Sequence, residues 1–114
     1  MDNPPKPSEA DKLISQLLSE DPRLRDIVKE FVDNLASRVE EFRTAHEKLD
    51  WDTLVSLAHR LKGAAGSYGY PDISKLCAEM EHELRAHQAE QFAQWLASLA
   101  SFATAARAGL GESP

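Results

Sequence analysis

Apolar residues recur every three or four positions from Leu13 to Phe102, and no segment of the sequence shows the apolar–polar alternation of a half-buried strand. This spacing predicts amphipathic helices along the chain. Three prolines fall within residues 1–7, so we expect a flexible lead-in there. Ser8 can then cap a short first helix, with Asp11 three residues later. The apolar stripe of that helix comprises Leu13, Ile14, Leu17 and Leu18.

A second, long helix is predicted to begin with Asp21 as its cap and Pro22 at its first position. Its apolar stripe comprises Leu24, Ile27, Val28, Phe31, Leu35, Val39, Phe42 and Leu49. Asp50 is expected to cap a third helix in the same way. The core stripe of this third helix comprises Leu54, Leu57, Leu61, Ala64 and Tyr68.

Pro71 and Asp72 restart the chain into a predicted fourth helix, whose inward residues are Ile73, Leu76, Cys77, Met80 and Leu84. The last helix is expected from about Ala89 to Ala106, with Gly109 just past its end, and its inward residues are Phe92, Trp95, Leu96, Leu99 and Phe102. The pattern therefore predicts an all-α fold, an antiparallel four-helix bundle with a short additional N-terminal helix. We expect this bundle to cover residues 8–108 and to be followed by a flexible tail over residues 109–114.

Composition narrows the classes of function. The chain has 114 residues, enough for one modest core, and a formal net charge of -6 without a dense basic cluster, which argues against nucleic acid as a partner. Its only cysteine, Cys77, excludes an internal disulfide and fits a reducing cytoplasm. No apolar run approaches the roughly 20 residues of a membrane span, and the start of the chain does not resemble a signal peptide. We therefore expect a cytoplasmic protein without membrane association, and the Met1 start favours a free-standing one.

The segment AHRLKGAAGSYGY, residues 58–70, contains three glycines, although glycine weakens a helix by roughly 1 kcal/mol per residue. On a helix, residues three and four positions apart share a face, and the core stripe lies on the face opposite His59. His59 is therefore expected to point outward. The residues that share its face are Asp52, Val55, Ser56, Lys62, Gly63 and Gly66.

An exposed neutral imidazole is a competent nucleophile near pH 7. Lys62, one turn beyond His59, can stabilise negative charge that gathers beside the ring. Gly63 and Gly66 leave the approach to the ring open to a bulky anion or to a partner's active site. Gly69 is better explained as the end of the helix, because Pro71 follows closely.

The order H-x-L-K-G-x5-G, formed by His59, Leu61, Lys62, Gly63 and Gly69, resembles the signature of histidine-containing phosphotransfer (HPt) domains. The similarity continues through Leu76, Cys77, Met80 and Glu81. The resemblance implies a phosphorelay intermediate: His59 accepts a phosphoryl group from the aspartate of one receiver domain and passes it to another. It also implies that Lys62 steadies the phosphoryl group and that Gly63 and Gly66 admit the receiver.

The same resemblance implies that the partners are response-regulator receiver domains and a hybrid sensor histidine kinase, and that the receiver supplies the magnesium ion. We therefore expect no cofactor bound by this chain. The sequence has no Gly-rich nucleotide loop and no room for an ATP-binding domain, so we expect a monomeric, stoichiometric carrier rather than a kinase.

Further partner contacts are expected from Ser56, Arg60 and Ser67. Val55 is either an isolated exposed residue or part of an apolar docking patch, and Tyr70 either packs at the helix junction or belongs to the docking surface. Glu79 and His82 have the Glu-x-x-His spacing of di-iron bundles, but no second pair accompanies them, so no metal site is expected.

Two alternatives to the relay stay open. The chain could be a helical adaptor that binds a receiver or a kinase without carrying a phosphoryl group. It could also be a dimeric bundle that supplies helices to a kinase, although the long second stripe is sufficient for one intrachain core.

Overall fold

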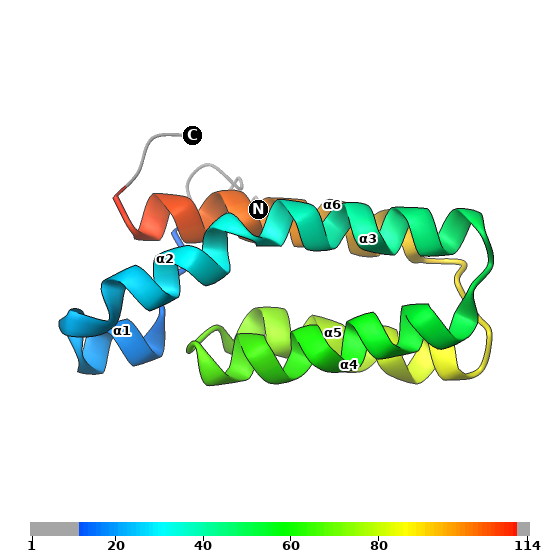
Figure 1. Ribbon diagram of the computed structural model, residues 1–114, viewed down its shortest axis with the longest axis horizontal. Helices are drawn as coiled ribbons and strands as arrows, with labels where there is room; N and C mark the ends of the chain where they lie inside the picture. The colour runs from blue at the N-terminus through cyan, green and yellow to red at the C-terminus, as the bar shows by residue number, and fades with distance from the viewer. Residues whose placement is uncertain (1–11, 112–114) are drawn as a thin grey trace, which may run out of the picture.

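The computed structural model describes residues 12–111, and all regular structure within that range is helical (Figure 1). The elements in chain order are α1 Gln16–Glu20, the 3₁₀ helix η1 Pro22–Leu24, α2 Arg25–Asp33, α3 Leu35–Glu47, α4 Trp51–Ser67, α5 Pro71–Arg85 and α6 Phe92–Gly109. The predicted all-α class is therefore confirmed.

The four long helices form two layers (Figure 1). Helices α3 and α6 lie side by side in one layer, and α4 and α5 in the other, with α1 and α2 at one end of the bundle. The most extensive contact between any two elements is that of α4 with α5. This pairing fixes how the face of α4 that carries His59 meets α5.

The residues predicted to start α4 and α5 do so in the structure. The Asp50 carboxylate accepts a hydrogen bond from Thr53 N at 3.2 Å, as an N-cap does, and Pro71 occupies the first position of α5.

The end of the last helix differs from the prediction. Helix α6 extends to Gly109, so the prediction that this glycine lies past the helix was wrong. Leu110 is buried, and the positive φ of +81° falls on Gly111 instead. The ordered bundle thus continues beyond residue 108.

The predicted long second helix was also wrong, because the chain divides there into η1, α2 and α3. At Asn34 the N–H is shared between the carbonyls of Glu30 and Phe31, which ends α2. Phe31, in α2, stacks on Tyr68 at the end of α4, with ring centroids 5.0 Å apart. An uninterrupted apolar stripe is therefore not sufficient evidence of an uninterrupted helix.

Two residues of that stripe do not face the core. Ile27 is exposed, and Leu49 is 60% exposed in the turn after α3 with a left-handed φ of +51°. Periodicity placed them inward because it cannot recognise a turn that lacks glycine and proline.

Residues 13–20 fasten the beginning of the described chain to the bundle. The predicted cap Ser8 and Asp11 lie outside the described residues; the observed α1 is capped by Ser15, whose Oγ accepts from Leu18 N at 3.0 Å and donates to Tyr68 O at 2.6 Å. Gln16 N donates to Gly69 O at 2.8 Å, and Leu13 N donates to Ala105 O at 2.9 Å. Ile14, predicted to be buried, is exposed.

Gly69 is required at the point where this segment meets α4. Its φ is +87°, and a Cβ there would collide with the backbone nitrogens of Gln16 and Leu17. The expectation that Gly69 ends the helix is confirmed, and the close approach of another segment is a second reason for glycine.

Cys77 lies at the centre of the core, fully buried on α5. Burial raises the pKa of its thiol to about 12, so it acts as a small apolar side chain, as expected. No helix among residues 12–111 is both long enough and apolar enough to cross a membrane.

Candidate functional site

The two faces of α4 divide as the sequence predicts. Leu54, Leu57 and Leu61 are buried, whereas the His59 side chain is 62% exposed. Two alanines extend the buried face beyond the predicted stripe, Ala58 and Ala65. His59 is therefore held on a helix whose opposite side is fixed in the core, with its ring in solvent.

A single carboxylate on α5, that of Glu81, organises the surroundings of His59. Its side chain is only 8% exposed. His59 Nδ1 lies 3.1 Å from Glu81 Oε2, and Arg85 Nη2 donates to the same oxygen at 2.6 Å. Lys62 Nζ forms an ion pair with the other oxygen, Oε1, at 2.8 Å. One carboxylate thus contacts three basic side chains from two helices.

These neighbours keep Glu81 ionised. The Lys62 ammonium, followed by the Arg85 guanidinium, lowers the pKa of the Glu81 carboxyl to about 2, and the hydrogen bond with His59 acts in the same direction, against the opposing effect of burial. An ionised carboxylate can only accept hydrogen bonds. In the neutral ring, His59 Nδ1 therefore carries the proton, which leaves the lone pair on Nε2.

Gly63 stands in open space. A Cβ built on it would have no atom within 4 Å, apart from its own helix and chain neighbours. At Gly66 the nearest atom would be Ser74 Oγ at 3.5 Å, an ordinary contact, and this hydroxyl donates to Lys62 O at 2.9 Å. The fold therefore requires glycine at neither position, unlike at Gly69.

The predicted contact residues separate into three groups. Ser56, Arg60 and Ser67 are exposed on α4, and Val55 is half-buried. Tyr70 is only 2% exposed and stacks on Phe31, with ring centroids 5.9 Å apart, so it packs at the helix junction and does not belong to a docking surface.

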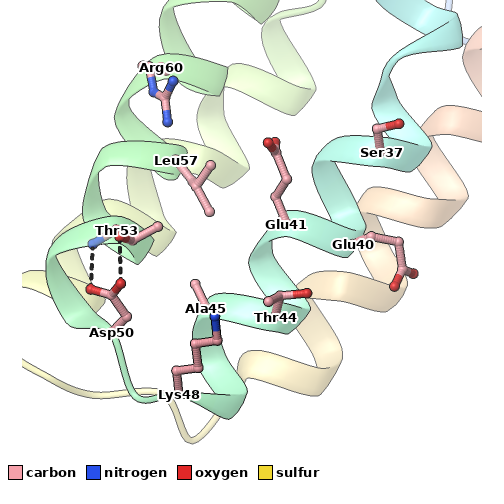
Figure 2. A pocket seen from close by; sticks show the side chains of 10 residues that line it. All are labelled: Ser37, Glu40, Glu41, Thr44, Ala45, Lys48, Asp50, Thr53, Leu57 and Arg60. Atoms are coloured by element: carbon pink, nitrogen blue, oxygen red, sulfur yellow. Dashed lines mark hydrogen bonds between the residues drawn. The ribbon is translucent and has the colours of Figure 1, made fainter.

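Arg60 lines a groove of about 500 Å³ between α3 and α4. Figure 2 shows its guanidinium on the α4 side and Glu41 on the α3 side. The remaining lining residues are Ser37, Glu40, Thr44, Ala45, Lys48, Asp50, Thr53 and Leu57. Lys62 contacts Glu81 on α5, whereas Arg60 faces the groove toward α3. The two cations therefore lie on opposite sides of α4.

The sequence interpretation did not give Glu81 and Arg85 a role in the site. Their spacing of four residues, with the acid first, was a usable signal for an ion pair on one helix. Nothing local linked that pair to His59, 22 positions earlier. Glu79 and His82 are both exposed, and no cluster of three His, Cys, Asp or Glu side chains suited to a metal occurs in the described part of the chain.

Comparison with protein-family models matches residues 26–109 to the Hpt domain. Searches of curated proteins and of solved structures each gave no significant match. The matched range begins in α2 and ends with α6. It includes all the residues of the His59 cluster, by which we mean His59, Lys62, Glu81 and Arg85. The chain therefore belongs to the Hpt domain family, whose members are phosphotransfer intermediates of two-component signalling and interact with receiver domains.

Proposed function

We propose that this chain is a phosphorelay intermediate in which Nε2 of His59 carries the phosphoryl group between receiver domains. One observation supports this assignment above the others: His59 is largely exposed while its Nδ1 is bonded to an ionised carboxylate. That bond orients the ring and leaves Nε2 as the nucleophilic nitrogen.

In the accepting step, the Nε2 lone pair attacks the phosphorus of a receiver's aspartyl phosphate. The Nε2–P bond forms, the P–O bond to the aspartate breaks, and its electron pair stays on the receiver's carboxylate. The ring keeps its Nδ1 proton and becomes positively charged, which Glu81 stabilises through the existing contact. In the donating step, the carboxylate of a second receiver attacks phosphorus and the electron pair returns to Nε2.

Charge around the ring favours an incoming phosphoryl group. Lys62 and Arg85 contribute two positive charges and Glu81 one negative charge, so the cluster around neutral His59 has one net positive charge. Lys62 is the cation that we expect to stabilise the phosphoryl oxygens in transit. Magnesium is expected to come with the receiver, and a hybrid sensor kinase is the expected origin of the phosphoryl group.

Gly63 and Gly66 give the receiver room to approach, because neither is needed for packing within the chain. On the other flank of α4, the exposed Ser56, Arg60 and Ser67 are available for contact with the receiver surface. We propose that the chain acts as a stoichiometric monomer, with one phosphoryl group per molecule.

The first experiment mixes the purified chain with a phosphorylated receiver domain and magnesium, and measures intact mass over time. We expect one acid-labile phosphoryl group on the wild-type chain and none on His59→Gln. His82→Gln is the matched control, because His82 is exposed on the neighbouring helix, α5. Transfer onto His59→Gln would refute the assignment.

The adaptor alternative gives a different result in the same assay. A folded wild-type chain that binds receivers but accepts no phosphoryl group from a broad panel of them would favour it. Sedimentation at several concentrations tests the monomer, since a dimeric bundle would dissociate on dilution.

A further inference from the structure

The two carboxylate oxygens of Glu81 have different partners. Oε2 accepts from both His59 Nδ1 and Arg85 Nη2, whereas within the described residues Oε1 is contacted by Lys62 alone. The bond that sets the state of the His59 ring and the contact made by Lys62 therefore use separate oxygens. Arg85 acts on the oxygen that holds the ring.

Phosphotransfer makes competing demands on Lys62. The cation that stabilises a phosphoryl group on Nε2 is the same one that neutralises Glu81 in the resting site. Its Nζ lies 2.8 Å from Oε1 at the end of a flexible side chain that is 35% exposed, so it can turn toward the phosphoryl oxygens. Its departure, however, would remove one of the two cations paired with a buried carboxylate, and without the other one the carboxylate would be uncompensated next to an arriving phosphoryl group, which is costly.

We propose that Arg85 is a positioning residue of the phosphotransfer site, which anchors Glu81 on His59 Nδ1 while Lys62 leaves to bind the phosphoryl group. The inference rests on the proposed function in its account of Lys62. Arg85 Nη2 bonds Oε2 at 2.6 Å from one turn further along α5, and its guanidinium is always charged. It therefore keeps the carboxylate compensated and in place without leaving its own helix.

The test measures the protonation of the His59 ring separately from phosphoryl transfer. Two-bond ¹H–¹⁵N NMR correlations of the His59 ring report which nitrogen carries the proton, with no phosphoryl donor present. Lys62→Ala mimics the departure of Lys62, and we expect the Nδ1–H form to stay predominant in it. In Lys62→Ala combined with Arg85→Gln, we expect that predominance to be lost.

Transfer rates supply the second readout. Arg85→Gln alone is expected to slow transfer from a phosphorylated receiver by roughly 10-fold, the size of one lost charge-assisted hydrogen bond. Arg85→Lys should recover part of the rate, because it keeps the charge. Arg43→Gln is the matched control, since Arg43 pairs with Glu40 on the surface of α3 at 3.4 Å, away from the cluster, and should change neither readout.

Two results would overturn the role of Arg85: an unchanged Nδ1–H population in the double variant, or loss of that population in Lys62→Ala alone. Failure of the proposed function looks different. In that case the wild-type chain accepts no phosphoryl group, while the NMR comparison still decides whether Arg85 holds Glu81 on the ring.

Discussion

Glu81 shows how one side chain can be both a structural and a functional element. A carboxylate that is 8% exposed would be costly to bury alone, but contact with Lys62 and Arg85 offsets that cost. The same charge that stabilises the packing of α4 on α5 fixes the proton on His59 Nδ1. Stability and the state of the nucleophile are therefore linked through one residue.

This link gives stability a defined pH dependence. The Glu81 pKa is lowered from an ordinary value of 4.5 to about 2 in the folded chain. A lowered pKa contributes stability that is fully present above about pH 4.5 and is lost as the pH falls toward about 2. The contribution is at most about 3 kcal/mol, reduced by solvent screening because Arg85 is largely exposed.

Urea unfolding of the wild-type chain and of Glu81→Gln, repeated from pH 7 to pH 2, measures this contribution. We expect the wild-type advantage to shrink through that acidic window. Glu79→Gln is the control, because Glu79 is exposed two residues away on α5. An advantage that stays constant with pH would show that Glu81 stabilises through packing rather than through its charge.

Among the elements, α4 carries a helix-weakening residue that its packing does not require. Gly63→Ala should stabilise the fold by about 0.5–1 kcal/mol, because alanine is the better helix former and its Cβ would meet nothing. It should also slow transfer, because a methyl group would stand four residues from His59 in the path of the receiver.

Denaturant unfolding and the receiver transfer assay measure the two effects on the same protein. Ser101→Ala on the exposed face of α6 provides a comparable gain in helix propensity far along the chain from the site, and it should leave transfer unchanged. If Gly63→Ala is more stable and transfers at the wild-type rate, glycine is not needed for access.

Element boundaries were predictable where a side chain itself marks them. Asp50 and Pro71 gave the starts of α4 and α5, and the spacing of the apolar stripe on α4 gave the outward direction of His59. The break at Asn34 was not predictable, because the apolar stripe continues through it and neither glycine nor proline marks it. Glu81 was overlooked as a site residue because its contact with His59 exists only after α4 packs on α5.

On the scale of the whole molecule, the first part of the described chain is bonded to its middle and to its last helix. Residues 13–20 are bonded both to Gly69, just after the His59 helix, and to Ala105 near the end of α6. The end of α4 is thus fixed by a segment about 50 residues earlier as well as by its neighbours in the bundle. The monomeric state and the cytoplasmic location stay predictions.

Cys77, described above as part of the core, also makes the protein its own reporter of opening. The sequence contains one thiol, and in the folded chain it is fully buried with its pKa raised to about 12. A thiol reagent can reach it only when the core opens, and the thiolate that reacts forms readily only after that opening.

The rate of labelling of native protein by a disulfide reagent should therefore rise with urea in parallel with global unfolding. Rapid labelling in the absence of urea would show that a local opening exposes α5. Glu81 lies one helical turn beyond Cys77 on α5. The labelling rate can therefore be compared with and without a phosphoryl group on the chain. A difference would show that rearrangement of charge around His59 changes how often the core opens at Cys77.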